Sequence, residues 1–160
     1  MDRIDRIIKN REFARLVGEI EELEKDRIFC HHDMAHFLDV ARIAALMAAD
    51  EGLQTDREMI YAAALLHDTG RGRQYTEGIA HEAASAEIAP AILKDAGFSP
   101  EEIALITEAI RQHGNEDIKD RADITGLIYR ADKASRRCYM CKAQDKCHKR
   151  ADKLVMNVKY

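Results

Sequence analysis

Histidine and aspartate residues occur in this sequence where interior-facing apolar residues are expected. His36, His67, His81, His113 and Asp132 each share a helical face with Val, Ile or Ala residues three or four positions away. Because that spacing marks the buried stripe of an α-helix, we expect all five side chains to point into the core. Imidazole and carboxylate groups that converge inside a helical bundle are the ligands that divalent metal ions take there.

Asp68 directly follows His67, and its two carboxylate oxygens can bridge two metal ions. Each residue alone also has a purely structural explanation, since a single histidine on an apolar face is usually a core residue with a hydrogen-bond partner. Buried without partners, however, such groups would cost on the order of several kcal/mol together. Their recurrence on successive helices therefore favours a metal centre over a set of unrelated core residues.

A second group of metal-binding residue types lies near the C-terminus. Cys138, Cys141 and Cys147 follow the pattern C-x2-C-x5-C, and His148 comes next. A C-x2-C pair is a common metal hook because its two thiolates can converge on one ion. With Cys30 or His148 as the fourth ligand, the pattern predicts a structural zinc site that fastens the C-terminal segment to the core. An iron–sulfur cluster and unligated thiols are the alternatives.

The elements that must position these residues are helices. The chain has 160 residues, of which 46% are hydrophobic and 34% charged, and it contains eight glycines and two prolines. This length and balance predict one all-α domain over residues 1–160 with a sizeable core and few turns. Residues 28–137 are expected to form the core of the domain, and residues 138–160 form a C-terminal segment whose structure the pattern leaves open.

About six helices are predicted, over residues 2–25, 33–51, 56–69, 80–96, 100–113 and 121–137. The clearest boundary is Ser99-Pro100-Glu101-Glu102, where Ser99 caps the helix and Glu102 completes a capping box. Thr55 is predicted to cap the third helix and Gly70 to end it. Residues 70–78 are interpreted as a loop.

The segments that carry these residues resemble the HD superfamily of metal-dependent phosphohydrolases. The matching stretches are HDMAHFLDVARIAALMA around His36, AALLHDTGR around His67-Asp68, HEAASAEIA at His81, ITEAIRQH ending at His113, and YRADKASR around Asp132. The resemblance covers about residues 28–137 and includes the additional histidines of two-metal members. It implies a helical bundle with the metal site at its centre.

The resemblance also implies how the ligands divide between two ions. One ion would be held by His36, His67, Asp68 and Asp132, and the other by Asp68, His81 and His113. The implied cofactors are divalent ions such as iron or manganese. The implied reaction is hydrolysis of a phosphate ester or anhydride by a metal-activated hydroxide.

Positively charged residues follow two of the expected ligand positions and suit phosphate recognition. They are Arg71 and Arg73 after the His67-Asp68 pair, and Lys133, Arg136 and Arg137 after Asp132. We expect Asp68, Arg71 and Lys133 to act in catalysis, and Arg71, Arg73, Lys133 and Arg136 to bind the substrate. A solvated surface position is the alternative for each cation.

His32 lies one helical turn before His36. It is expected either to contact the substrate or to cap the start of the helix. His31, its neighbour, is expected at the surface.

The composition narrows the class of substrate. The net charge of −4 argues against a polynucleotide, so a nucleotide, a dinucleoside polyphosphate or another small phosphate ester is expected. No stretch is long and apolar enough to span a membrane, and no signal-peptide pattern is present, so we expect a cytoplasmic protein. The oligomeric state stays open, a homodimer included.

Two other functions fit the same residues. One is a di-iron oxygenase, because some proteins of this fold use dioxygen at a similar site. The other is a module that binds metal or nucleotide without catalysis. Iron content with oxygen consumption would identify the first, and tight binding without turnover would identify the second.

Overall fold

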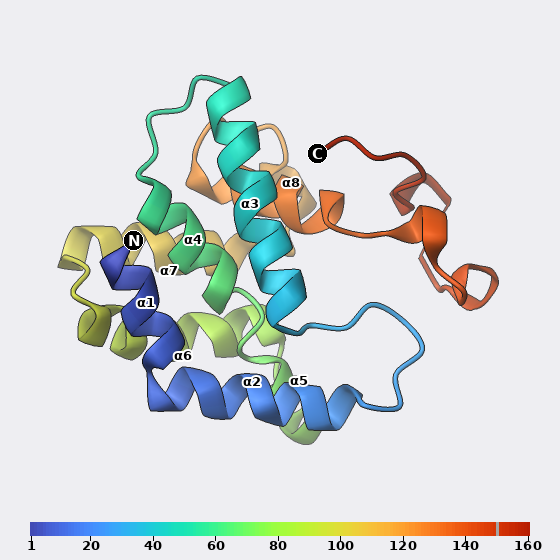
Figure 1. Ribbon diagram of the computed structural model, residues 1–160, viewed down its shortest axis with the longest axis horizontal. Helices are drawn as coiled ribbons and strands as arrows, with labels where there is room; N and C mark the ends of the chain where they lie inside the picture. Colours follow the sequence, from blue (N-terminus) through green and yellow to red (C-terminus); the bar gives the residue numbers. More distant parts are fainter. Residues whose placement is uncertain (150) are drawn as a thin grey trace.

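The computed structural model describes residues 1–149 and 151–160, and within them the fold is entirely helical (Figure 1). The α-helices are α1 (Asp2–Lys9), α2 (Arg11–Glu24), α3 (Met34–Asp50), α4 (Arg57–Leu66), α5 (Arg71–Glu77), α6 (His81–Ala96), α7 (Pro100–Gln112) and α8 (Ile124–Ala134). Four short 3-10 helices follow or separate them: η1 (Glu116–Ile118), η2 (Cys138–Met140), η3 (Gln144–Lys146) and η4 (Ala151–Lys153). The all-α prediction is confirmed.

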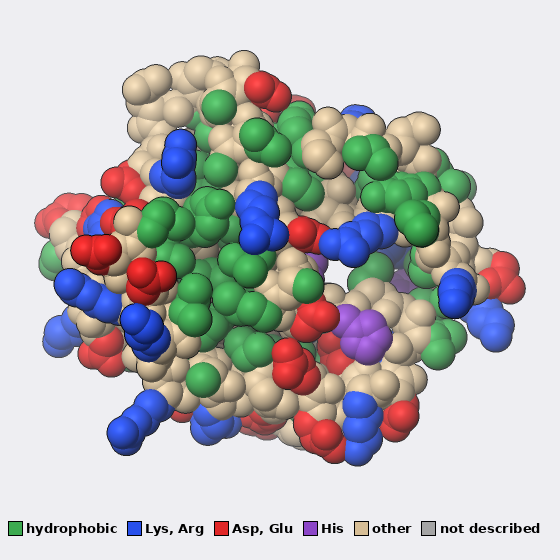
Figure 2. All heavy atoms as spheres, in the orientation of Figure 1, with side chains coloured by type: hydrophobic (Ala, Val, Ile, Leu, Met, Phe, Trp, Pro, Cys, Tyr) green, Lys and Arg blue, Asp and Glu red, His purple; other side chains and the backbone are tan. Residues whose placement is uncertain are grey.

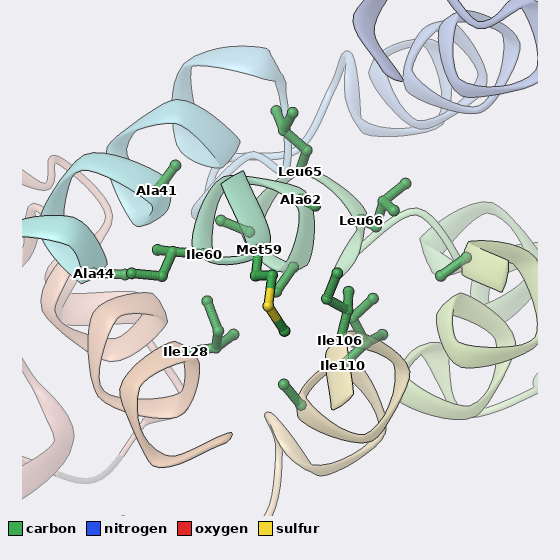
Figure 3. Packing of buried hydrophobic residues seen from close by; sticks show 14 of the residues in the cluster. Ala41, Ala44, Met59, Ile60, Ala62, Leu65, Leu66, Ile106, Ile110 and Ile128 are labelled. Atoms are coloured by element: carbon green, nitrogen blue, oxygen red, sulfur yellow. The ribbon is translucent and has the colours of Figure 1, made fainter. Parts of the chain in front are cut away.

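Helix α4 lies at the centre of the bundle. It packs against α3, α7, α8, α1 and α6, while α6 packs along α7 and α2 lies beside α5. The sequence of α4, REMIYAAALL, explains this position, because eight consecutive apolar or aromatic residues leave it no polar face after its first turn. Ile60, Leu65 and Leu66 are among its fully buried side chains, and they belong to the same core cluster as Ile106, Ile110 and Ile128 from α7 and α8 (Figure 3).

Among the described residues the structure has eight α-helices where about six were predicted, and several boundaries differ. Helix α4 ends at Leu66 and not at Gly70, which instead precedes α5, and α8 spans Ile124–Ala134 and not residues 121–137. The first predicted helix is broken at Asn10, whose backbone is extended and whose side chain accepts hydrogen bonds from the N–H groups of Glu12 and Phe13, so α2 starts anew there. Asp56 rather than Thr55 caps α4, because the Asp56 carboxylate accepts from the second and third N–H groups of the helix.

The segment interpreted as a loop after Gly70 is the short helix α5. Arginine, glutamine and tyrosine dominate it, and it lacks an apolar stripe long enough to be recognised in the sequence. It ends at Gly78, which adopts a φ of 73° that a residue with a Cβ rarely takes. The capping box predicted at Ser99 and Glu102 is confirmed.

The chain ends in a segment without α-helix, residues 138–149 and 151–160. It lies on the same side of the molecule as the loop between α2 and α3 (Figure 1). Within the described residues, none of the helices combines the length and apolar character that crossing a membrane requires.

Candidate metal centre

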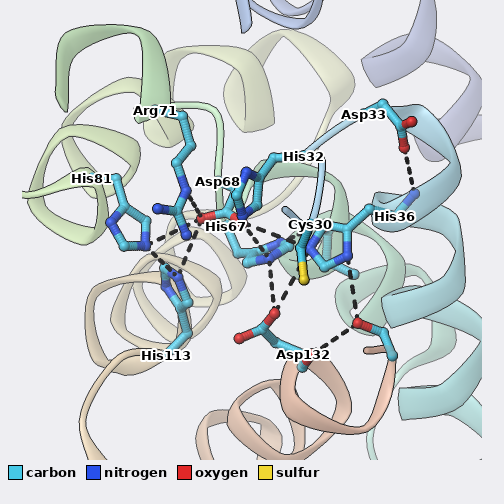
Figure 4. Close-up of polar contacts among 12 residues, drawn as sticks. Cys30, His32, Asp33, His36, His67, Asp68, Arg71, His81, His113 and Asp132 are labelled. Carbon is cyan, nitrogen blue, oxygen red and sulfur yellow. Dashed lines mark hydrogen bonds and ion pairs between the residues drawn. The ribbon is translucent and has the colours of Figure 1, made fainter. Parts of the chain in front are cut away.

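The ends of four helices and the last turn of a fifth converge on one point inside the bundle (Figure 4). His36 comes from the first turn of α3, where the Asp33 cap holds its backbone N–H. His67 follows the last residue of α4, His81 begins α6, and His113 follows the last residue of α7. Asp132 comes from α8. The structure thus brings together all the side chains that the sequence placed on buried faces.

Asp68 lies at the centre of this cluster and is fully buried. Its Oδ2 atom lies 3.6 Å from His36 Nε2 and 3.2 Å from His67 Nε2. Its Oδ1 atom lies 3.2 Å from His81 Nε2 and 3.5 Å from His113 Nε2. The two oxygens therefore face two different pairs of histidines, which is the arrangement of a carboxylate that bridges two ions.

Two groups of ligand atoms are close enough to hold one ion each. His36, His67 and Asp68 form the first, and Asp68, His81 and His113 form the second, with all ligand atoms of a group within 4.8 Å of one another. The division matches the expected one except at Asp132, which lies outside the first group.

Asp132 stands at the edge of the first group. Its Oδ1 atom lies 3.7 Å from His36 Nε2 and 4.0 Å from His67 Nε2. Its Oδ2 atom accepts a hydrogen bond of 2.6 Å from Lys133, which also donates to the carbonyl of His113. Lys133 therefore holds Asp132 against the end of α7 and does not project freely into the cavity.

His67 and His113 are oriented by the same local device. Each follows a helix end and directs Nδ1 at the carbonyl three residues earlier, at 2.7 Å for Ala64 and 2.6 Å for Ile110. These carbonyls lack helical partners at the C-terminal end of a helix, so the imidazole N–H satisfies them. With the proton on Nδ1, the Nε2 lone pair of each ring faces the cluster, as a metal ligand requires.

The cluster leaves polar atoms unpartnered. Among residues 1–149 and 151–160, the buried side-chain atoms without a hydrogen bond are His36 Nε2, His67 Nε2, Asp68 Oδ2, His81 Nδ1 and Thr107 Oγ1. The first three converge on one another. Such atoms are costly to bury unless something else binds them, so the residues fit a divalent ion.

The charge states also suit metal binding. Burial would raise the pKa of Asp68, but the charges of His67 and Arg71 lower it well below its ordinary value. The pKa of Asp132 is likewise lowered, because Lys133 and His67 outweigh burial. Burial lowers the pKa of His81 to about 3, so this ring is neutral at pH 7. Ionised carboxylates and neutral imidazoles are the forms that bind metals, so Asp68, Asp132 and His81 are in the binding form. Burial opposes a charge on His67, but Asp68 and Asp132 raise the pKa of its ring, so His67 releases its extra proton when an ion binds.

His32 lies over the cluster and is held by a buried acid that the sequence did not single out. Glu24, only 2% exposed, accepts from the backbone N–H of His32 at 2.7 Å and pairs with its Nδ1 at 2.6 Å. Tyr75 donates a further hydrogen bond to Glu24. His32 Nε2 is left 3.8 Å from Asp68 Oδ2. The ring therefore faces the metal centre and does not cap α3, a role that Asp33 takes.

Of the predicted substrate-binding cations, Arg73 does not reach the site. Its guanidinium pairs with Glu77 and Glu87 on the surfaces of α5 and α6. Arg71 does reach it, but donates to Asp68 Oδ1 at 2.9 Å and to Gln74, so it orients the Asp68 carboxylate. Arg136 lies 3.8 Å from Asp132 Oδ2. His31 is exposed, as expected.

The metal centre opens into a cavity of about 820 Å³. Its walls are the α2–α3 loop, the end of α8 and the C-terminal segment. Figure 2 shows this face hollowed, with histidine and charged side chains at the edge of the hollow. Among the lining residues are His32, Arg71, Lys133, Arg136 and Lys149.

The cysteines line the same cavity without forming a closed site. Cys138 is buried, Cys141 and Cys147 are half-buried, and Cys30 is exposed. In the part of the chain that the structure describes, the ligand groups within 4.8 Å are the two that share Asp68, and no cysteine belongs to either. His148 is exposed, and its ring packs edge-on against Phe29 at 5.9 Å between centroids.

Comparisons with known proteins show which family this chain is similar to. The model of the family described as HD domain matches residues 33–157. An uncharacterized protein of Clostridium beijerinckii is 42% identical over 148 residues, which are 92% of this chain and 92% of that protein. An uncharacterized protein of Methanocaldococcus jannaschii is 34% identical over 119 residues, which are 72% of this chain and 62% of that protein.

One solved structure is also similar. It is the crystal structure of a predicted HD superfamily hydrolase from an uncultured Thermotogales bacterium, with 26% sequence identity and a TM-score of 0.61. The match covers 78% of this chain and 66% of that one.

Proposed function

This chain belongs to the HD domain family, and from that membership and the position of Asp68 we propose that it is a metal-dependent phosphohydrolase of a small phosphorylated metabolite. The single observation that carries the proposal is the shared carboxylate. Asp68 offers one oxygen to each of two ligand groups. Paired ions about 3.5–4 Å apart are a recurring arrangement in enzymes that hydrolyse phosphate esters.

The ions and the protein would have separate tasks. Divalent ions bound in such a site lower the pKa of water towards neutrality and neutralise charge on phosphate oxygens. Arg71 and Lys133 keep Asp68 and Asp132 ionised and fixed in orientation. Arg136 and His32 face the cavity beside the ligands, so they are placed to bind the phosphate group. In this proposal, Arg71 and Lys133 act on the ligands, and the phosphate contacts come from Arg136 and His32.

The cavity supports a small substrate. Its volume of about 820 Å³ lies in the range of sites for metabolite-sized ligands. Arg27, Arg136 and Lys149 line it together with Phe29, which combines positive charge with an aromatic face. We infer a substrate that joins phosphate to a flat or apolar group, with nucleotides and dinucleoside polyphosphates as the first compounds to test.

Metal stoichiometry tests the proposal. We expect about two equivalents of divalent metal at the His/Asp centre of each wild-type chain, counted apart from any zinc bound by the cysteines. His81→Ala should keep one equivalent, because His36, His67 and Asp68 remain, and should lose most hydrolysis of a phosphate-ester panel. Metal content by mass spectrometry and phosphate release measure the two effects.

His31→Ala is the matched control, since His31 is exposed and lies outside both ligand groups. One equivalent in the wild type that His81→Ala leaves unchanged would contradict the two-ion centre. Redox-active iron with oxygen consumption and no phosphate release would replace the hydrolase by an oxygenase. Ligand binding without any turnover would leave a non-catalytic module.

The support of His32 gives an independent prediction. Glu24→Gln replaces a charged acceptor by an amide that holds the His32 ring less firmly. We expect kcat/KM to fall by roughly 10- to 100-fold, the usual effect of removing a carboxylate that orients a histidine at a metal site. Metal content should stay at the wild-type value, because Glu24 contacts neither ligand group.

The control is Glu22→Gln, on the same helix but exposed and paired only with Lys25 among the described residues. A Glu24→Gln protein with wild-type kcat/KM would show that the hydrogen bonds to His32 have no role in the reaction. Glu24→Asp, which restores the charge with a shorter reach, should recover part of the loss.

A further inference from the structure

The C-terminal segment buries too little to hold its own position. Among residues 138–149 and 151–160, Cys138 and Ala143 are the buried side chains, and no α-helix forms. A hydrogen bond from Tyr139 N–H to the Val155 carbonyl and an ion pair from Lys153 to Glu116 are among its contacts. Segments with so small an apolar core usually need a disulfide or a metal ion.

The local turns present the cysteines together. Cys138 opens η2 and Cys141 follows it, with the Cys141 N–H donating to the Cys138 carbonyl at 3.1 Å. A 3-10 helix has about three residues per turn, so side chains three positions apart project in the same direction. Cys147 follows η3, where its N–H donates to the Gln144 carbonyl at 3.1 Å, and all three cysteines line the cavity.

Cys30 supplies the opposite side of this arrangement. It lies in the loop between α2 and α3 and lines the same cavity. Partial burial raises the pKa of its thiol, and so do the charges of Cys138 and Cys141, while Arg136 and Lys149 oppose them. Cys30, Cys138 and Cys141 thus line one cavity from two different segments of the chain. His148 instead turns its exposed ring against Phe29.

We propose that Cys30, Cys138, Cys141 and Cys147 bind one structural Zn²⁺ that fastens the C-terminal segment to the α2–α3 loop. Four thiolates around one ion are a common tetrahedral zinc site. The sulfur atoms do not yet lie within 4.8 Å as a group of three or more, so binding draws the two segments together. Neither segment contains α-helix, so the shift is confined to Cys30 and the C-terminal segment, while Glu24 keeps its hydrogen bonds to His32.

The surroundings balance the charge of such a site. Each thiol releases a proton on binding, so four thiolates and Zn²⁺ carry a net charge of −2. Arg136 and Lys149 line the cavity next to the cysteines. This site is separate from the His/Asp centre and does not depend on it. It closes one wall of the cavity into which that centre opens.

The test uses the full chain loaded with Zn²⁺, and with Co²⁺ as a spectroscopic probe. We expect one equivalent of zinc beyond those at the His/Asp centre, lost in Cys138→Ser/Cys141→Ser. Co²⁺ should give a sulfur-to-cobalt charge-transfer band that this variant lacks and that His81→Ala retains. Met140→Ser is the matched control, since Met140 lies in the same turn and is 78% exposed.

Thiol reactivity covers the case in which the double variant does not fold. In the zinc-loaded wild-type protein, the four thiols should resist a thiol reagent until a chelator is added. Four thiols that react freely, with zinc content unchanged, would overturn the proposal, and so would a disulfide or an iron–sulfur absorption spectrum. A protein that binds zinc at the cysteines but no metal at the His/Asp residues would contradict the proposed function and still support the cysteine site.

Discussion

Asp68→Asn is expected to release both metal ions at once and to lower phosphate-ester hydrolysis on the order of a thousandfold. The magnitude follows from losing several kcal/mol of metal-derived transition-state stabilisation, at about 1.4 kcal/mol per factor of ten. An asparagine keeps one oxygen and replaces the other by an NH₂ group. Whichever way the amide turns, a donor faces one pair of histidines where a ligand atom is needed.

The result should differ from that of any single histidine. His81 and His36 each face one oxygen of Asp68, so His81→Ala or His36→Ala should each keep one equivalent of metal. Only the change at Asp68 touches both ligand groups. Metal content measured on the three variants side by side therefore separates a bridging carboxylate from an ordinary ligand.

Asp95→Asn is the matched control, because Asp95 is exposed on α6 and remote from both groups. The metal-free Asp68→Asn protein must also be shown to fold, since Arg71 loses its partner at Asp68 Oδ1. Circular dichroism and thermal melting provide that check. A folded Asp68→Asn protein that still binds two ions would rule out the bridging role.

The centre of the site could be anticipated because its residues obey helical spacing. His36, His67, His81, His113 and Asp132 interrupt apolar stripes, and the stripes dictate that these side chains point inwards. The structure places them around Asp68, as that argument requires. Spacing alone does not fix distances, and this explains why Asp132 lies slightly outside the first ligand group, held there by Lys133.

The supporting residues could not be anticipated in the same way. Glu24 binds Tyr75, which lies 51 positions away in the sequence, so the pair shows no local spacing pattern. Glu24 is also buried, and a glutamate among other charged residues gives no sign of burial in the sequence. Arg73 looked equivalent to Arg71 in the sequence. They differ because α5 is a helix, which turns Arg71 towards Asp68 and Arg73 towards Glu87. A loop over residues 70–78, as the sequence predicts, would not distinguish the two arginines.

The boundaries that failed have a local cause. Thr55 and Asp56 are adjacent residues that can both cap a helix, and the carboxylate of Asp56 reaches two N–H groups of α4. Asn10 ends α1 for a similar reason, because its side chain accepts hydrogen bonds from the first turn of α2 and so caps that helix. Side chains that hydrogen-bond to nearby backbone compete with helix continuation, and the outcome depends on where α1 and α2 pack.

Gly70→Ala should both destabilise the fold and disturb the second ligand group. A Cβ atom at Gly70 would lie 2.5 Å from the backbone nitrogen of Ser85, 2.6 Å from the carbonyl oxygen of His81 and 2.7 Å from Ala84 Cβ. Two of these atoms are helix backbone, so α6 itself must shift. We expect a loss of about 2 kcal/mol in the free energy of unfolding.

The functional effect follows from where the contact lies. Gly70 N–H donates to Ser85 Oγ at 2.8 Å, which holds the turn after Asp68 against the first turns of α6. His81 opens that helix, so a displaced α6 moves His81 away from Asp68 Oδ1. We therefore expect Gly70→Ala to resemble His81→Ala, with about one equivalent of metal left. Thermal melting and metal content measure the two effects.

Gly18→Ala provides the opposite expectation within the same chain. Gly18 lies inside α2, is exposed, and has nothing within 4 Å of the place where a Cβ would sit. Alanine there should stabilise the protein by roughly 0.5–1 kcal/mol, since glycine inside a helix costs about that much. If Gly70→Ala instead had the melting temperature of the wild type and kept two ions, the contact between Gly70 and α6 would have no role in positioning His81. Gly70 lies two residues after Asp68, and its backbone approaches the backbone of α6 closely. Gly70→Ala therefore tests whether this contact sets the distance between His81 and Asp68.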